Sequence, residues 1–270
     1  MTLAPEAFDF VATLVRTRSA IQLTAGKEYL VESRLAPLAR AAGAPDVGAF
    51  IRAVRQDVRL QPQVVEALTT NETSWYRDRT PFATLRSTVL PEMVQSRRNR
   101  VRVWSAACSS GQEPYSIAML FADEFPGLMP SITATDLSER MLAQGREGRY
   151  SQLEVNRGLP APTLVKHFTR EGASFQISAA LRRQVTFLSH NLLHAPPPGG
   201  PFDIIFLRNV LIYFDVATKR EVLARVRSVL APGGVLFLGA AETTTGIDSA
   251  WARVEIGGSS VYRAMEGKAA

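Results

Sequence analysis

The sequence predicts an α/β fold, with a mainly parallel sheet that is covered by helices on both faces. From about residue 100 onward, apolar runs alternate with segments of helical periodicity, which is typical of βαβ units. Before about residue 73 the periodicity is helical throughout, which predicts a small all-α domain. Residues 150–183 interrupt the alternation with glycines, prolines and a possible hairpin, which indicates a small inserted β-subdomain. We therefore expect two domains, at 1–73 and 74–270.

The composition is that of an ordinary globular protein. The chain has 270 residues, of which 46% are hydrophobic and 21% are charged, so it is long enough for two modest domains. It holds no apolar run of about 18 residues, and we expect no membrane insertion. Its first residues lack the pattern of a signal peptide, so we expect a cytoplasmic protein. The net charge of +6 is only a weak indication of anionic partners.

Cysteine and histidine are too few and too scattered to indicate metal binding. Cys108 is the single cysteine, which excludes an internal disulfide. His167, His190 and His194 are not arranged with the spacing of metal ligands, and we expect them at the surface or in packing. The sequence therefore predicts a protein without a metal site.

One helix of the N-terminal segment has a basic side. Asp46 is predicted as its N-cap. Apolar residues fall on one side and arginines on the other: Ile51, Val54 and Val58 against Arg52, Arg55 and Arg59. This side is either a solvated face or a docking face for an acidic protein.

The stretch from Val101 to Ser116 predicts the start of a nucleotide-binding βαβ unit. A β-rich run ends in a turn of small residues, Ser105–Gly111, and a helical run follows from Pro114. The turn has one glycine, Gly111, and so departs from the G-x-G-x-x-G pattern that binds a pyrophosphate. This difference favours an adenosyl group without phosphates. The alternative interpretation is a buried strand followed by a tight turn.

Polar residues follow the later strands as well. The strand predicted at Ser131–Asp136 ends in an acid, at the distance from the turn where a carboxylate accepts hydrogen bonds from ribose hydroxyls. Asn191 follows a third strand, and Arg208 and Asn209 follow a fourth. Because the carboxyl ends of parallel strands meet at one edge of the sheet, we expect these side chains to lie along one edge.

Several motifs in one order resemble the chemotaxis receptor methyltransferases, the CheR family. They are Asn71–Arg77, Trp104–Ser116, Ala134–Ser138, Asn191-Leu192, Phe202–Phe214 and Leu230–Leu236. The resemblance implies S-adenosylmethionine as the methyl donor, S-adenosylhomocysteine as the product, and glutamate side chains of chemoreceptors as the acceptors. It also implies a Rossmann-like methyltransferase domain behind the helical domain.

The resemblance also implies the site residues. The family's cofactor contacts correspond to Asn71, Thr73, Arg77, Glu113, Asp136, Asn191, Leu192, Arg208 and Asn209. Arg77 and Tyr213 match positions near the transferred methyl and are the candidate catalytic residues. The insertion around Phe168–Phe175 lacks the proline- and glycine-rich pattern of relatives that grip a receptor's C-terminal pentapeptide, so we expect no such tether.

The expected chemistry needs positioning more than acid–base catalysis. A glutamate side chain, with a reference pKa of about 4.3, is already ionised at pH 7, so no strong base is required. Arg77 is expected to orient the carboxylate, and Tyr213 to hold it with its hydroxyl. The alternatives are a structural salt bridge for Arg77 and a packing role for Tyr213.

The expected partner is the cytoplasmic helical region of chemoreceptors, bound by a monomeric enzyme. Two other functions remain open: an S-adenosylmethionine methyltransferase for a small molecule or RNA, and a non-catalytic cofactor-binding signalling module. RNA is disfavoured, because the sequence shows neither an obvious base nor a patch of interleaved aromatic and basic residues. The basic run Arg97–Arg100 with Arg102 indicates a solvated turn. We therefore expect no nucleic-acid partner.

Overall fold

The computed structural model describes residues 3–96, 99–256 and 258–265. It divides into two compact units, Met1–Thr70 with Tyr213–Thr218, and Asn71–Ile212 with Lys219–Ala270. The first unit thus ends at Thr70 and takes in a short segment from far along the chain. Arg97 and Arg98 of the basic run lie outside the described residues.

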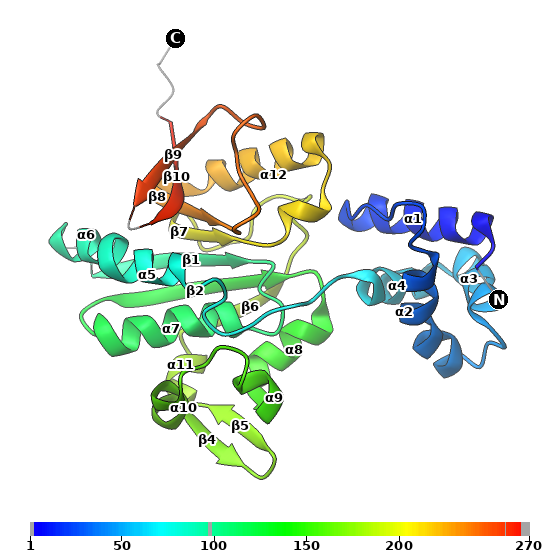
Figure 1. Cartoon of the computed structure of the whole chain (residues 1–270), viewed down its shortest axis with the longest axis horizontal. Helices are drawn as coiled ribbons and strands as arrows, with labels where there is room; N and C mark the ends of the chain where they lie inside the picture. Colours follow the sequence, from blue (N-terminus) through cyan, green and yellow to red (C-terminus); the bar gives the residue numbers. More distant parts are fainter. Residues whose placement is uncertain (1–2, 97–98, 257, 266–270) are drawn as a thin grey trace. The chain divides into compact units, whose positions relative to one another are not determined.

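The first unit is helical, as expected (Figure 1). Its elements are α1 (Pro5–Ser19), α2 (Glu28–Ala41), α3 (Val47–Gln56), the 3-10 turn η1 (Val58–Leu60) and α4 (Gln61–Leu68). Each helix except the short 3-10 turn contributes branched aliphatic side chains to a common core, among them Val11, Val15, Val31, Leu35, Val54 and Val64, all fully buried. Asp46 caps α3 as predicted, because its carboxylate accepts a hydrogen bond from the Ala49 N–H at 2.6 Å.

The predicted basic face of α3 is wrong in its last turn. The helix ends at Gln56, and Asp57 is extended, so Val58 and Arg59 start a separate 3-10 turn. Val58 is 66% exposed instead of facing the core. Arg59 forms an ion pair with Asp57 at 2.7 Å. The physical reason is that Asp57 caps the following turn, accepting the Arg59 N–H with its side chain.

The second unit contains the predicted α/β fold. Its sheet has the strand order β6-β2-β1-β7-β8-β10-β9. The strands are β1 (Arg100–Ala106), β2 (Met129–Asp136), β6 (Val185–Ser189), β7 (Phe202–Leu207), β8 (Leu230–Leu238), β9 (Trp251–Ile256) and β10 (Ser259–Ala264). In this order the first four neighbouring pairs of strands are parallel and the last two pairs are antiparallel, which confirms a mainly parallel sheet.

Helices connect these strands and cover them. They are α5 (Thr80–Thr84), the π-helical turn η2 (Leu85–Val89), α6 (Leu90–Gln95), α7 (Gln112–Glu124), α8 (Glu139–Glu147) and α12 (Val216–Ser228). Alternate strand residues separate into two sets. Val103, Ile204 and Phe206 join one core cluster with α5 and α7, whereas Trp104 and Ile205 are buried outside that cluster. Both faces of the sheet are therefore covered, as predicted.

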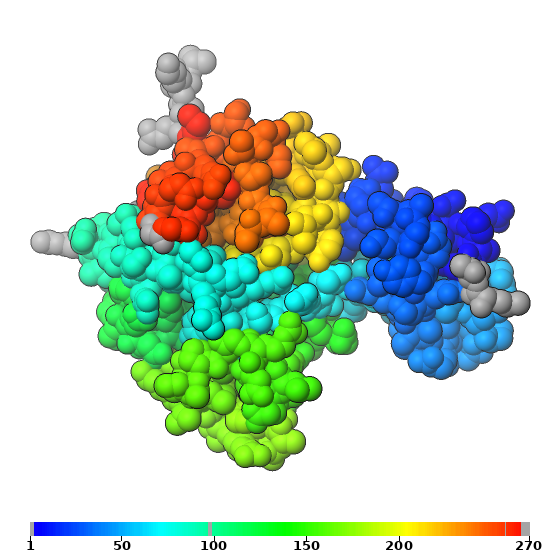
Figure 2. Space-filling view, viewed as in Figure 1, coloured from blue at the N-terminus to red at the C-terminus, as the bar shows by residue number. Residues whose placement is uncertain are grey.

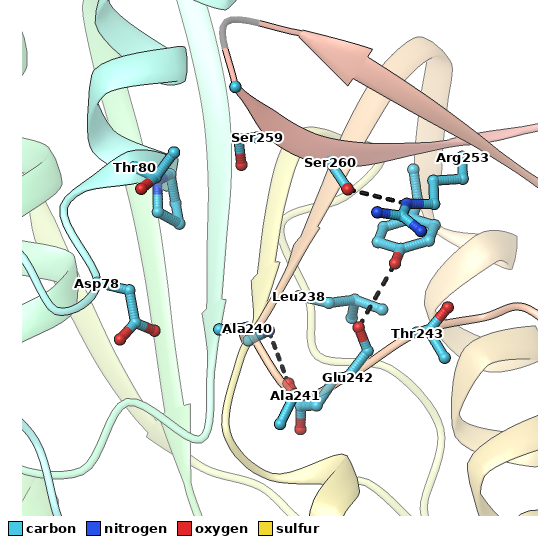
Figure 3. Close-up of a pocket in the computed structure, with 14 residues that line it drawn as sticks. Asp78, Thr80, Leu238, Ala240, Ala241, Glu242, Thr243, Arg253, Ser259 and Ser260 are labelled. Carbon is cyan, nitrogen blue, oxygen red and sulfur yellow. Dashed lines mark hydrogen bonds between the residues drawn. The ribbon is translucent and has the colours of Figure 1, made fainter.

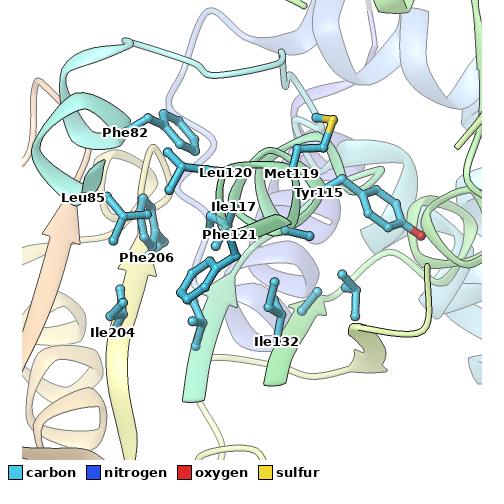
Figure 4. Close-up of a cluster of buried hydrophobic side chains, with 14 of the residues drawn as sticks. Phe82, Leu85, Tyr115, Ile117, Met119, Leu120, Phe121, Ile132, Ile204 and Phe206 are labelled. Carbon is cyan, nitrogen blue, oxygen red and sulfur yellow. The ribbon is translucent and has the colours of Figure 1, made fainter. Parts of the chain in front are cut away.

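Aromatic packing fixes the core next to α7. Phe206 of β7 stacks on Phe237 of β8 with ring centroids 4.6 Å apart. Phe82 of α5 packs against Phe206 at 5.8 Å, and Figure 4 shows these rings beside Ile117 and Phe121 of α7. This core packs β7 and β8 against α5 and α7, and it thereby supports the strands whose carboxyl ends carry predicted site residues.

The predicted insertion is a small subdomain with its own sheet, and Figure 2 shows its surface in green and yellow-green. It comprises β3 (Arg149–Ser151), α9 (Gln152–Val155), α10 (Ala161–His167), β4 (Phe168–Glu171), β5 (Ser174–Ile177) and α11 (Ala179–Arg182). The strand order is β3-β5-β4 with antiparallel pairing, so the predicted hairpin is confirmed. In the part of the chain that the structure describes, no helix is both long and apolar enough to cross a membrane.

Candidate active site

The turn between β1 and α7 is held in an unusual backbone conformation. Ala107, Ser109 and Gly111 all have positive φ, at 56°, 49° and 94°. Residues other than glycine rarely adopt this region, so contacts around the turn must hold Ala107 and Ser109 in it. At Gly111 a Cβ atom would lie 3.0 Å from the Phe187 ring and 3.2 Å from the Tyr150 hydroxyl. The glycine is therefore needed both for its conformation and for its space.

Asp136 ties this turn to the end of β2. The residue is only 8% exposed. Its carboxylate accepts hydrogen bonds from the Ser109 N–H at 2.8 Å and the Ser138 N–H at 2.9 Å. The predicted ribose-binding acid thus lies beside the predicted small-residue turn, and it also shapes that turn.

Arg208 joins three segments of the site through a buried network. Its side chain is 1% exposed and pairs with Glu113 and with Asp78, each at 2.8 Å. It also donates to the main-chain oxygen of Arg77 at 2.7 Å. Glu113 in turn accepts a hydrogen bond from the Ser105 hydroxyl at 2.7 Å. Predicted site residues from α7, from the end of β7 and from the segment before α5 are therefore in contact.

The segment that carries Arg77 is strained. Tyr76, Asp78 and Arg79 have φ values of 49°, 64° and 47°, a region that side chains other than glycine rarely adopt. Such conformations persist only where surrounding contacts enforce them, and they cluster at functional sites. Here one such contact comes from Trp75, whose indole N–H donates to the Glu154 main-chain oxygen of the inserted subdomain at 3.1 Å.

The Arg77 guanidinium has a main-chain partner and, within the described ranges, no carboxylate partner. Its guanidinium donates to the Glu72 main-chain oxygen at 2.9 Å. Among the described residues no Asp or Glu forms an ion pair with it, in contrast to Arg208. A structural salt bridge, the alternative role for Arg77, is therefore not found in the described part of the chain. Its positive charge is available to an anionic ligand.

The remaining predicted residues are distributed as follows. Asn71 accepts a hydrogen bond from the Ser109 hydroxyl through its main-chain oxygen at 2.8 Å, and Thr73 lies in the same segment. Asn191 and Leu192 follow β6, the strand next to β2, and the Asn191 side chain accepts the Leu193 N–H at 3.0 Å.

Asn209 and Tyr213 are the last two of the predicted site residues. Asn209 follows Arg208 with a φ of 57°, and its N–H donates to Glu242 at 2.8 Å. Tyr213 is described with the first unit, where its main-chain oxygen accepts the Gln22 N–H at 3.2 Å. The structure therefore collects the predicted residues of the second unit at the carboxyl edge of the sheet, and Tyr213 is not placed among them.

Two acidic residues of this edge were not predicted. Asp78 pairs with Arg208, and Glu242 binds the backbone after β7. Both border a cavity of about 480 Å³ that is also lined by Thr80, Arg253 and Tyr262 (Figure 3). Glu242 follows the carboxyl end of β8, so the rule that identified the residues after the other strands would have identified it too.

The single thiol does not supply a nucleophile. Cys108 lies in the small-residue turn and is buried. Burial raises the pKa of Cys108 well above its ordinary value, and the nearby Asp136 carboxylate adds to the shift. The thiol therefore stays protonated at neutral pH, and thiolate chemistry at this edge is disfavoured.

Comparison with known proteins identifies the family. Residues 71–256 match the family model described as CheR methyltransferase, SAM binding domain. Residues 6–69 match the model described as CheR methyltransferase, all-alpha domain. The chain belongs to the CheR methyltransferase family. It accordingly contains the family's S-adenosylmethionine-binding domain, and the sequence-based assignment of family and cofactor is confirmed.

Relatives in this CheR family are similar over nearly their whole length. Chemotaxis protein methyltransferase Cher2 of Pseudomonas putida is 40% identical over 95% of this chain and 97% of the relative. Chemotaxis protein methyltransferase 1 of Pseudomonas aeruginosa is 39% identical over 98% and 100%. Chemotaxis protein methyltransferase of Vibrio parahaemolyticus is 38% identical over 97% and 98%. The chain is thus a chemotaxis-type methyltransferase by family.

The residues at this edge fit the cofactor of a CheR methyltransferase. Among the described residues, Arg208 Nε is a buried donor without a hydrogen-bond partner, and a ligand carboxylate would satisfy it. The turn Ser105–Gly111 consists of small residues, and the Asp136 carboxylate lies beside it, bound to the Ser109 N–H. Both features suit the carboxylate and the adenosyl group of S-adenosylmethionine.

Proposed function

We propose that this protein transfers the methyl group of S-adenosylmethionine to glutamate carboxylates of chemoreceptors. The products would be glutamate methyl esters and S-adenosylhomocysteine. The observation that carries the proposal is the nearly full-length similarity to relatives named chemotaxis protein methyltransferases. We further propose that the enzyme works in the cytoplasm as a monomer, on the cytoplasmic helical region of the receptors.

The proposed donor site consists of residues along the carboxyl edge of the sheet. They are Asn71, Thr73, Arg77, Glu113, Asp136, Asn191, Leu192, Arg208 and Asn209. Bound S-adenosylmethionine supplies a methyl group on a positively charged sulfur. Asp136 would hold the ribose hydroxyls, and Arg208 would present its unpartnered Nε to the donor's carboxylate.

Arg77 and Tyr213 are proposed to position the acceptor. The acceptor carboxylate is ionised at pH 7, so the site must align it with the methyl instead of deprotonating it. Arg77 suits this role because, among the described residues, its charge is not neutralised by a carboxylate. Tyr213 would add a hydrogen bond from its hydroxyl. Both contacts should steer the carboxylate gently, since a tight grip would reduce its nucleophilicity.

Product identification tests this proposal against its alternatives. The protein would be incubated with donor carrying a trideuterated methyl group, together with a chemoreceptor cytoplasmic fragment or with RNA. We expect mass spectrometry to find the labelled methyl on receptor glutamates, as an ester that mild alkali removes. Label on RNA alone would favour the RNA methyltransferase. Donor binding by calorimetry without transfer to any acceptor would favour a non-catalytic signalling module.

A further inference from the structure

Glu242 has a buried carboxylate on the loop that follows β8 (Figure 3). The residue is 9% exposed. Its Oε2 accepts hydrogen bonds from the N–H groups of Gly239 at 2.7 Å and Asn209 at 2.8 Å. Its Oε1 accepts from Val210 at 2.9 Å and Ile212 at 3.3 Å. Four main-chain donors therefore converge on one side chain.

The negative charge of Glu242 is balanced by main-chain dipoles. In the described ranges, no cationic side chain forms an ion pair with Glu242. A buried carboxylate without such a partner is costly unless hydrogen bonds compensate for the lost water. An apolar side chain would fill the same space without that cost. The presence of a buried carboxylate at position 242 is thus explained by the four main-chain N–H groups that it binds.

Most of these N–H groups belong to the segment that follows β7. This segment, residues 208–213, begins with Arg208 and Asn209 of the proposed site. Residues 208–210 belong to no helix or strand, and Asn209 has a φ of 57°. The 3-10 turn η3 (Leu211–Tyr213) follows, and the first N–H groups of such a turn have no acceptor within it. An acceptor from elsewhere in the chain must therefore satisfy these N–H groups. Glu242 is that acceptor for Asn209, Val210 and Ile212.

Gly239 makes the contact between the two loops possible. β7 and β8 are parallel neighbours, with Leu207 opposite Leu238, so the loops after them leave the sheet side by side. A Cβ atom on Gly239 would lie 2.7 Å from Glu242 Oε2 and 2.9 Å from the Asn209 nitrogens. The close approach therefore depends on a residue without a side chain at this position.

We propose that Glu242 is a positioning residue for methyl transfer. It fixes residues 209–212 against the end of β8, and it acts on the reaction through Arg208 and Asn209. The inference rests on the proposed function of these two residues. It adds that the conformation of the segment, and not only the presence of their side chains, sets the rate.

Glu242→Gln is the informative variant. Glutamine keeps the length of the side chain, but one of its two terminal groups donates hydrogen bonds instead of accepting them. That group would face N–H groups of the segment and repel them. Asp203→Asn is the matched control, because Asp203 is also buried and accepts a main-chain N–H, that of Arg102 at 2.9 Å, at the opposite end of β7.

The experiment measures hydrogen exchange and transfer in the full-length protein. In Glu242→Gln we expect faster amide exchange across 208–213 by mass spectrometry. We also expect the single-turnover rate to fall at least about tenfold at saturating S-adenosylmethionine, with the receptor KM within about threefold of wild type. Asp203→Asn should melt earlier but keep the wild-type rate and the wild-type exchange across 208–213. Glu242→Asp, which keeps the charge with a shorter reach, should recover part of the rate.

Either of two results would overturn the proposal. One is a wild-type single-turnover rate in Glu242→Gln. The other is unchanged exchange across 208–213 in that variant. If Glu242→Gln does not fold, Glu242→Asp is measured in its place. Faster exchange across 208–213 together with a wild-type single-turnover rate in Glu242→Asp would then overturn the proposal. The exchange measurement needs no acceptor, so a failure of the proposed receptor substrate would be seen separately, as absence of transfer by the wild-type protein.

Discussion

Two arginines at the same edge of the sheet have opposite surroundings. Arg208 is buried and pairs with Glu113 and Asp78. Arg77 is half-buried and, among the described residues, has only a main-chain partner for its guanidinium. A buried charge with two counter-charges helps to hold the surrounding segments together, whereas a charge that no carboxylate neutralises suits an anionic ligand. The two side chains should therefore respond differently to substitution.

Asp136 allows a residue-level test of donor binding. Asp136→Asn removes the charge but keeps the shape of the side chain. Charge-assisted hydrogen bonds contribute roughly 1.5–3 kcal/mol each, so we expect donor affinity to fall at least about tenfold by calorimetry. Because Asp136 also binds Ser109 and Ser138, circular dichroism must show that the fold is retained. Unchanged affinity in a folded variant would reject Asp136 as a ribose ligand.

Contacts with the inserted subdomain hold the strained segment around Arg77 in place. Trp75 packs edge-on against Tyr150 at 4.9 Å and Phe168 at 5.4 Å, both in the inserted subdomain. Its main-chain N–H donates to the Arg157 oxygen at 3.0 Å. The subdomain thus buttresses the segment that carries Arg77. This is a structural role for the insertion, separate from any contact with a receptor.

Truncating Trp75 should weaken the packing between the inserted subdomain and the segment that carries Arg77. Trp75→Ala deletes a fully buried indole, and such truncations cost about 3–5 kcal/mol. We expect a lower free energy of unfolding by denaturant titration and weaker donor binding at temperatures where the protein remains folded. Trp75→Phe should lose less of both, because it keeps an aromatic ring for the edge-on packing. A Trp75→Ala variant as stable as wild type would show that the subdomain does not support the segment.

Of the three arginines predicted on the basic face of α3, the structure leaves Arg52 as the candidate for contact with a receptor. Arg59 is paired with Asp57, and Arg55 lies over the Phe10 ring and donates to the Glu6 main-chain oxygen. Arg52 is exposed on α3 and forms no ion pair among the described residues. If this face contacts an acidic receptor surface, Arg52→Glu should raise the receptor KM, more at low salt than at high salt.

Arg59→Glu is the matched control for that experiment, because the charge of Arg59 is already compensated by Asp57. We expect a smaller change in the receptor KM than for Arg52→Glu, and unchanged donor affinity in both variants. Equal kinetics of Arg52→Glu and wild type at low salt would mean that this face is merely solvated.

At the scale of the whole molecule, the features predicted from sequence are those with a strong local pattern. The parallel strands were visible as apolar runs, and Asp136 and Arg208 followed from where those runs end. The edge strand β9 was missed although Arg253 and Glu255 alternate with its apolar residues, because the strands were predicted from continuous apolar runs. The position of Glu242 could have been predicted from the end of β8, but its hydrogen-bond partners could not, because they are main-chain groups of another segment.

We propose that Arg77 and Tyr213 position the acceptor for transfer. The direct test is single-turnover methyl transfer to a receptor fragment at saturating donor. Tyr213→Phe should slow transfer with donor affinity within about threefold of wild type, since only the hydroxyl is lost. Arg77→Ala should lose both donor affinity and rate, and Arg77→Lys should recover the rate only in part, because a point charge cannot reproduce the planar guanidinium. Wild-type rates in both Tyr213→Phe and Arg77→Lys would contradict the claim.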